Sequence, residues 1–191
     1  MYGYIEIRAK FAVHPATSTI WFSAEQDPVT RKGVEVDLVE NINKSIDDNT
    51  TEFFSNIHLW TYGSTQSLSL DSKWQEKEDA TYRTNPTVSL AEDFHTYGLM
   101  WTEKEYIFFV DGVEYYRYDI ENGILSENGD SVNSFRKPMF IVMNIGMQNA
   151  AAEGETQYCP IWQDGDPTEA YYSVDYVRLY QKSTDNGSLI K

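Results

Sequence analysis

Three acidic residues, Glu35, Asp37 and Glu40, stand close together in one segment whose other positions are mostly apolar. Side chains of a β-strand point alternately to its two faces, so Glu35 and Asp37 share one face and the valines beside them share the other. Glu40 has the wrong parity for the acidic face on a regular strand. One bulged residue near Leu38-Val39 would return it to that face, and bulges are common beside active sites. The segment therefore predicts three carboxyl groups on one face of a bulged strand.

Crowded carboxyl groups are suited to acid and base chemistry. Retaining glycoside hydrolysis needs two carboxyl groups about 5–5.5 Å apart, one ionised as the nucleophile and one protonated as the general acid. A third acid nearby separates the pKa values of these two groups. The alternative is a solvated acidic strand whose charges only aid solubility. Like charges on one strand oppose folding, and the core side of this strand is well formed, so we favour the catalytic interpretation.

The rest of the chain predicts the strands that must position these acids. Apolar residues recur mostly with period two, and β-branched and aromatic residues cluster, as is typical of half-buried strands. Asp111-Gly112 lies between two aromatic-rich runs and suits the positive φ values of a tight hairpin turn. We expect an all-β protein with two stacked sheets and strands over the runs 4–11, 19–24, 34–41, 55–61, 94–102, 106–110, 113–119, 138–147 and 171–181.

Length, charge and cysteine content narrow the class of protein. The 191 residues, 41% of them hydrophobic, suit a single domain over residues 1–191. Acidic residues outnumber basic ones 30 to 15, which opposes binding to nucleic acid and to anionic membrane surfaces. Cys159, the single cysteine, has no partner for an internal disulfide, and no apolar run suits a membrane span or a signal peptide. Because Met1-Tyr2-Gly3 leads almost directly into a strand, we expect that an upstream strand is missing.

The acidic motif and the segments around it resemble glycoside hydrolase family 16. The motif reads Glu35-x-Asp37-x-x-Glu40, and its spacing is similar to that of the bulged branch of laminarinases, agarases and carrageenases, which disfavours a lichenase. The resemblance extends over nearly the whole chain, through the segments 2–11, 94–101, 109–112 and 172–181.

This resemblance implies a concanavalin-like β-jelly-roll sandwich of two antiparallel sheets whose concave sheet holds a polysaccharide. It also implies a retaining double displacement with Glu35 as nucleophile, Glu40 as general acid and base, and Asp37 as an assisting acid that hydrogen-bonds the nucleophile. Many bacterial members bind a structural calcium on the convex side through an Asp of the closing strand, which matches Asp175; a salt bridge or a plain surface acid is the alternative. Catalysis by this route needs no metal or organic cofactor.

A glycan cleft needs aromatic platforms beside hydrogen-bonding groups, because sugar rings present apolar C–H faces. Strand parity places Trp21 on the acid-bearing face, and it places His58 and Trp60 on the cleft side of their strand. Asn144 resembles a family asparagine near the cleft. For each of these four residues the alternative is a structural role: a hydrogen-bonded structural histidine for His58 and a role outside the cleft, such as packing in the core, for the others.

Arg31 and Lys32 occupy positions where the family often carries a Trp, and Thr17-Ser18-Thr19 replaces a laminarinase-type Trp-Pro-Ala stretch. The chain thus departs from the standard laminarin pattern. Arg31 is a candidate for contact with an acidic or sulfated sugar, and plain solvated charge is the alternative.

Taken with the resemblance, these residues predict a retaining endo-hydrolase of a β-linked polysaccharide. We expect β-1,3-glucan as the first candidate substrate and an algal galactan such as agarose or porphyran as the second. A non-catalytic glycan-binding module is the alternative from another class, since the same sandwich without working acids would still bind sugar. Transglycosylation also stays open. We expect a monomer whose partner is the polysaccharide, located outside the cell, in the periplasm or at the cell surface.

Overall fold

The computed structural model of the protein describes residues 2–13, 16–29, 31–41, 52–61, 68–69, 81–83, 89–123, 131–146, 164–182 and 189–190. Strands dominate these ranges, and the helix among them, α2, is short (Ser131–Phe135). Within the same ranges, no helix has the length and apolar character needed to cross a membrane. Cys159 lies outside the described residues. The all-β prediction is confirmed.

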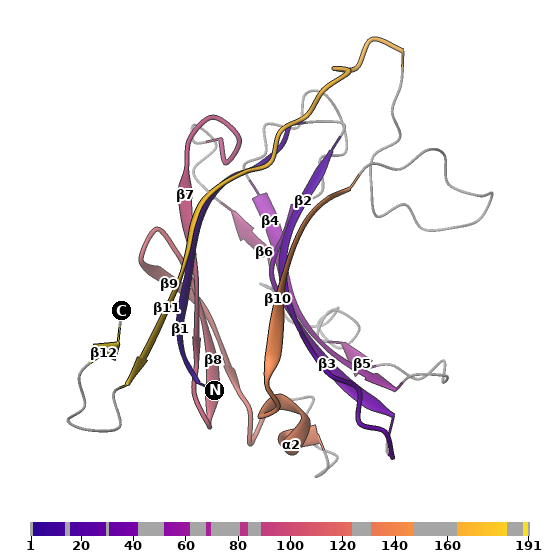
Figure 1. The fold of residues 1–191 in the computed structure, drawn as a ribbon, viewed down its shortest axis with the longest axis vertical. Helices are drawn as coiled ribbons and strands as arrows, with labels where there is room; N and C mark the ends of the chain where they lie inside the picture. Colours follow the sequence, from indigo (N-terminus) through magenta and orange to yellow (C-terminus); the bar gives the residue numbers. More distant parts are fainter. Residues whose placement is uncertain are drawn as a thin grey trace.

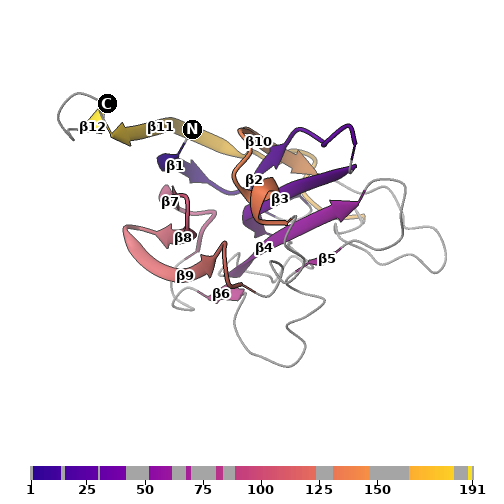
Figure 2. The same cartoon turned by 90° about the horizontal axis from the view of Figure 1, so that it is seen from below.

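Two antiparallel sheets form the two layers of a sandwich (Figures 1 and 2). The first, which we call the β1 sheet, has the order β12-β11-β1-β7-β8-β9. Its strands are β1 (Gly3–Lys10), β7 (His95–Trp101), β8 (Glu105–Val110), β9 (Val113–Asp119), β11 (Ser173–Lys182) and β12 (Leu189–Ile190). The second, the β3 sheet, has the order β10-β2-β3-β4-β5, and β6 also pairs with β4. Its strands are β2 (Thr17–Ala24), β3 (Lys32–Asn41), β4 (Glu52–Thr61), β5 (Leu68–Ser69), β6 (Thr81–Arg83) and β10 (Met139–Gly146).

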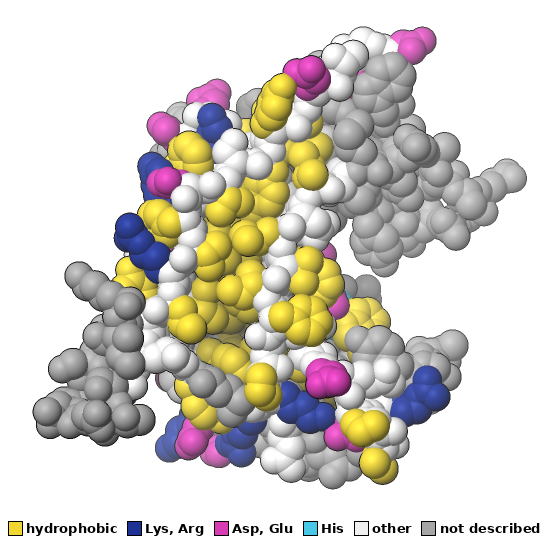
Figure 3. All heavy atoms as spheres, viewed as in Figure 1, with side chains coloured by type: hydrophobic (Ala, Val, Ile, Leu, Met, Phe, Trp, Pro, Cys, Tyr) yellow, Lys and Arg dark blue, Asp and Glu magenta, His cyan; other side chains and the backbone are white. Residues whose placement is uncertain are grey.

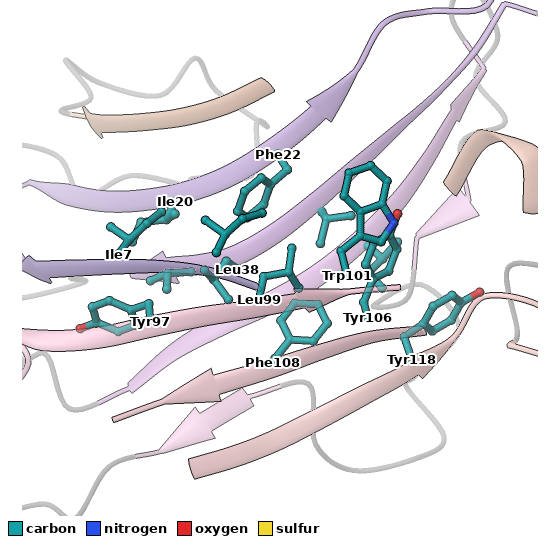
Figure 4. Packing of buried hydrophobic residues seen from close by; sticks show 14 of the residues in the cluster. Ile7, Ile20, Phe22, Leu38, Tyr97, Leu99, Trp101, Tyr106, Phe108 and Tyr118 are labelled. Atoms are coloured by element: carbon teal, nitrogen blue, oxygen red, sulfur yellow. The ribbon is translucent and has the colours of Figure 1, made fainter. Parts of the chain in front are cut away.

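Strand alternation places one apolar row of each sheet between the two layers. Leu38 and Phe22 of the β3 sheet face Leu99 and Phe108 of the β1 sheet, and all four side chains are buried (Figure 4). Full burial of a side chain of this size contributes about 1.5–3 kcal/mol relative to leaving it in water. This shared core fixes which face of each strand remains outside, and so which side chains can form a site.

The hairpin between β8 and β9 turns at Asp111 and Gly112, as the sequence predicts. Their φ angles are +48° and +76°, the left-handed region that a two-residue hairpin turn requires at both central positions. The Asp111 carboxylate accepts a hydrogen bond of 2.9 Å from the backbone N–H of Thr96 on β7. The turn is thereby fastened to the neighbouring strand.

One side of the sandwich, along β10 and along the part of β11 that precedes its pairing with β12, exposes core-facing apolar side chains. Figure 3 shows a continuous apolar strip along this side of the sandwich. The register partners of these side chains on β1 and β2 belong mainly to the buried core. These side chains are 37–50% exposed and comprise Ile141, Met143, Ile145, Val174, Val177 and Leu179. An additional strand would find both a pairing edge and an apolar surface here, and the expected upstream strand stays a prediction.

Candidate active site

The central strand of the site, β3, carries the predicted bulge. Asp37 lies opposite Asn56 of β4, and Glu40 lies opposite Phe54 of β4. Two residues of β3 but only one residue of β4 lie between these two pairs. The pairing with β2 shifts at the same place. Two successive residues, Leu38 and Val39, both belong to the hydrophobic core, as expected where a bulge turns neighbouring side chains to the same face. The bulge returns Glu40 to the face of Glu35 and Asp37, as predicted.

These three acids line a hollow on the outer face of the β3 sheet, with a volume of about 180 Å³. The floor and walls come from three neighbouring strands, β2, β3 and β10. Glu35 retains 23% exposure of its side chain, whereas Asp37 retains only 5%. The residues that line the hollow are Thr19, Trp21, Glu35, Asp37, Glu40 and Asn144.

Trp21 and Asn144 meet in this hollow, as the sequence analysis expected of cleft residues. The Asn144 side-chain oxygen accepts hydrogen bonds from the Trp21 indole N–H, at 2.8 Å, and from the Thr19 hydroxyl, at 2.7 Å. Because that oxygen takes both bonds, the amide nitrogen of Asn144 is the end left to donate toward the hollow. The pair thus offers an aromatic ring of fixed orientation and a nearby donor, which suits a sugar ring.

His58 and Trp60 project to the same face from β4, while Ile57 and Leu59 are buried, in agreement with the predicted parity. The Nε2 atom of His58 lies 3.0 Å from an Asp37 carboxylate oxygen and 3.9 Å from a Glu35 oxygen. The rings of His58 and Trp60 are stacked, with centroids 4.8 Å apart and an interplanar angle of 14°. His58 is therefore part of the acidic cluster, but neither His58 nor Trp60 is among the residues that line the hollow, and their contact with sugar stays a prediction.

Burial and crowding change the acid strength of the cluster. The pKa of Glu35 is raised from 4.5 to about 6, because burial and then the negative charge of Asp37 raise it by more than the His58 charge and a hydrogen bond from Trp60 lower it. For His58, burial lowers the pKa, but the hydrogen bond and charge of Asp37, with the charges of Glu35 and Glu40, outweigh burial and raise it. The imidazole thus tends to carry a proton beside Asp37, as an opposite charge favours the ionised form.

The sequence-predicted residues Arg31 and Asp175 do not line the hollow. Arg31 is exposed in the turn between β2 and β3, where its φ of +60° is unusual for a residue other than glycine. Asp175 lies on β11 in the other sheet, and its carboxylate is 2.6 Å from the guanidinium of Arg8. A calcium ion at Asp175 would have to displace this cation, so the residues described there fit an ion pair, the alternative interpretation of Asp175, better than calcium.

One group of potential metal ligands stands out in the described part of the chain. The donor atoms of Glu35, Asp37 and His58 lie within 4.8 Å of one another. A histidine binds a metal ion only through its neutral imidazole, whereas the surroundings of His58 raise its pKa and so favour the protonated form. The cluster therefore suits proton and charge balance between the acids better than metal coordination.

Ser55 and Tyr115 also belong to this region, although sequence reasoning missed them. The Ser55 hydroxyl donates to the backbone carbonyl of Leu38 at the bulge, at 2.8 Å, and the Tyr115 hydroxyl shares its proton between that carbonyl, at 3.2 Å, and the Ser55 oxygen, at 2.7 Å. Ser55 lies on the same strand face as the buried Phe53 and Ile57. A serine at such a core-facing position is the signal that could have drawn attention to it.

Comparison with known proteins identifies the family of this site. The family model "Beta-porphyranase A-D, GH16 domain" matches residues 1–182. The chain belongs to glycoside hydrolase family 16. Beta-porphyranase B of Phocaeicola plebeius is 29% identical in an alignment 202 residues long, which covers 94% of this chain and 58% of that protein.

Solved structures of this glycoside hydrolase family share the fold. A structure reported with endo-acting O-glycanases of the human gut microbiota, which initiate mucin breakdown, has a TM-score of 0.68 and 27% identity over 95% of this chain and 58% of its own. The laminarinase catalytic domain of Thermotoga maritima has a TM-score of 0.66 and 20% identity over 95% of this chain and 64% of its own. The jelly-roll sandwich of two antiparallel sheets is thereby confirmed. The chain spans less than two thirds of the length of each of these proteins.

Proposed function

We propose that this family 16 domain is a retaining, endo-acting hydrolase of a β-linked polysaccharide. The observation that carries the proposal is the bulge of β3, which places Glu35, Asp37 and Glu40 along one hollow beside Trp21. A site built on strands of a packed sheet holds its carboxyl groups in fixed positions, as catalysis by positioned groups requires.

In the proposed first step, the ionised carboxylate of Glu35 attacks the anomeric carbon while the Glu40 carboxyl donates its proton to the glycosidic oxygen. The glycosidic bond breaks, one sugar chain leaves with that proton, and the other is held as an ester on Glu35. In the second step, Glu40 takes a proton from water, the water oxygen attacks the anomeric carbon, and Glu35 is released as a carboxylate. Two inversions retain the anomeric configuration.

Asp37 and His58 have supporting roles in this scheme. Asp37 lies between Glu35 and Glu40 on the strand, and its negative charge raises the pKa of Glu35. The positive charge of His58, 3.0 Å from Asp37 and 3.9 Å from Glu35, opposes that effect. His58 therefore helps to keep Glu35 ionised, the form in which it can attack.

A β-linked galactan of the porphyran type is the first candidate substrate. The matching family model and the porphyranase B of Phocaeicola plebeius support this choice over the β-1,3-glucan that the sequence analysis placed first. Exposed Arg31, in the turn beside β3, adds a cation that could pair with a sugar sulfate. β-1,3-Glucan remains the second candidate because the motif spacing is also that of laminarinases.

The test is a panel of porphyran, agarose, carrageenan, laminarin and lichenan, assayed for new reducing ends with the wild type, Glu35→Gln and the exposed-site control Glu92→Gln. We expect cleavage of one polymer by the wild type and by Glu92→Gln, and loss of turnover with retained oligosaccharide binding in Glu35→Gln. Proton NMR of the first product should show the retained anomer, and a high concentration of acceptor sugar would reveal transglycosylation.

Other outcomes would reject parts of the proposal. Unchanged turnover in Glu35→Gln would reject the nucleophile. Inverted product would reject the double displacement. Binding of a polymer by the wild type without any cleavage would favour a glycan-binding module instead, the alternative from another functional class.

A further inference from the structure

The bulge that places Glu40 leaves its own backbone in need of a partner. Two residues of β3, Leu38 and Val39, lie opposite one residue of β4, Ser55, because Asp37 pairs with Asn56 and Glu40 with Phe54. A bulge interrupts the ladder of backbone hydrogen bonds at such a place. The Leu38 carbonyl receives side-chain hydroxyls instead, and Ser55, which donates from 2.8 Å, is only 3% exposed.

The second hydroxyl comes from the opposite sheet. Tyr115 of β9 shares its one hydroxyl proton between the Ser55 oxygen, at 2.7 Å, and the Leu38 carbonyl, at 3.2 Å. β9 has its own irregularity here: Phe108 pairs with Tyr116 and Phe109 pairs with Glu114, which leaves Tyr115 as the additional residue. The irregularity turns Tyr115 toward the core, where its ring packs edge-on against Phe53 at 5.8 Å.

We propose that Tyr115 and Ser55 are positioning residues for Glu40. They satisfy the Leu38 carbonyl, hold the peptide after Leu38 in its bulged orientation, and so keep the Glu40 carboxyl on the cleft face. A buried carbonyl that loses its partners favours rearrangement of the backbone that exposes it. Because the side-chain period of a strand is two, removal of the bulge would turn Glu40 to the opposite face.

This inference rests on the proposed function, since it assigns the two hydroxyls to the acid and base residue of that mechanism. It predicts a selective defect. Steps that need proton transfer by Glu40 should slow, while attack by Glu35 on a sugar with a good leaving group should not. A misplacement of about 1 Å is enough for roughly a 100-fold loss of rate.

The main variant is Tyr115→Phe, which removes one oxygen and keeps the packed ring. Its matched control is Tyr106→Phe, because Tyr106 also packs in the core and donates its hydroxyl to a backbone carbonyl, but to that of Phe135, at 2.6 Å, and not to the bulge. We expect similar losses of melting temperature in both variants. Only Tyr115→Phe should lose kcat on the polysaccharide that the panel identifies, porphyran or laminarin, by about 10- to 100-fold.

Two further measurements separate positioning from a general loss of structure. The first compares the polysaccharide with a 2,4-dinitrophenyl glycoside of the same sugar, whose departure needs no proton. The second adds azide, which attacks the glycosyl-enzyme without a general base. We expect Tyr115→Phe in azide to cleave the aryl glycoside at close to the wild-type rate. Ser55→Ala enters the same assays, and it replaces Tyr115→Phe if that variant does not fold.

Different outcomes would reject the positioning role of Tyr115 and Ser55 and the proposed hydrolase function. An equal loss of kcat on the polysaccharide and on the aryl glycoside, unaffected by azide, would overturn the positioning role. A wild-type kcat in both Tyr115→Phe and Ser55→Ala would overturn it as well. If the wild type cleaves nothing in the panel, the proposed function fails before the variants are compared. Wild-type turnover together with an unselective defect rejects the inference alone.

Discussion

Replacement of Glu35 by glutamine should stabilise the fold, and only where the native glutamate would be ionised. The pKa of Glu35 is raised from 4.5 to about 6, first by burial and then by the charge of Asp37. The folded protein therefore holds this proton more tightly than the unfolded chain does. Below pH 4 both states are protonated and Glu35 has no net effect. As the pH rises through the range from 4.5 to 6, ionisation is harder in the folded state and the free energy of unfolding falls.

The size of this effect follows from the shift. Each pKa unit corresponds to 1.36 kcal/mol, so a rise from 4.5 to about 6 corresponds to roughly 2 kcal/mol above pH 7. Glu35 is mostly buried, and the opposing charge of His58 is already part of the raised value. Glutamine has nearly the same shape but no charge. In a chain of this length, about 2 kcal/mol corresponds to a rise in Tm of roughly 4–8 °C.

The assay is thermal and urea unfolding of the wild type, Glu35→Gln and Glu92→Gln at pH 4 and pH 8. We expect Glu35→Gln to gain about 2 kcal/mol at pH 8 and close to nothing at pH 4. Glu92→Gln, at an exposed position, should follow the wild type at both pH values. A gain of equal size at pH 4 and pH 8 would refute the electrostatic reasoning, and so would a Glu35→Gln variant that is less stable at pH 8.

Four further predictions concern activity and ion binding. Because Glu35 must be ionised to attack, kcat/KM for wild-type cleavage should rise through pH 6, and an acid limb near pH 4 would contradict the raised pKa. Asn144→Ala should raise KM several-fold more than Asn144→Asp, because aspartate keeps the oxygen that accepts the hydrogen bond from the Trp21 indole. Equal effects of the two variants would assign the role of Asn144 to its amide N–H donor instead. Arg31→Gln should lower kcat/KM on sulfated porphyran about tenfold and leave agarose unaffected, whereas an equal loss on both would exclude a sulfate contact. Calcium added to chelator-treated protein should leave Tm unchanged, since Arg8 already occupies the Asp175 carboxylate.

Much of the site could be predicted from parity. The parity mismatch of Glu40, with the apolar pair Leu38-Val39 before it, predicts a bulge, and the strand registers confirm it. Parity also predicts which side chains of β4 face the acids, because His58 alternates with buried neighbours. These predictions succeed because β3 and β4 lie within a sheet with one buried face, where a slip by one residue would expose the whole apolar row.

Other features depend on contacts between distant segments and carry little sequence signal. The short strands β5, β6 and β12 were not predicted, since strands of two or three residues show no periodicity. Tyr115 reaches Leu38 only because β9 is irregular where it pairs with β8. Arg31 lies in a turn whose geometry, and not its parity, decides where the side chain points.

The position of β3 explains how the fold tolerates three carboxyl groups on one strand face. β2 and β4 pair with β3 on both sides, so its backbone is held along its length even where the acids repel one another. On its other face Val34, Val36, Leu38 and Val39 are at most 1% exposed. Each of these side chains contributes about 1.5–3 kcal/mol on burial, so a single one offsets the roughly 2 kcal/mol that an ionised Glu35 costs. The bulge adds a buried apolar residue on the core side in the same step that brings Glu40 to the cleft side, so the packing that stabilises β3 and the geometry that assembles the acids have one structural cause.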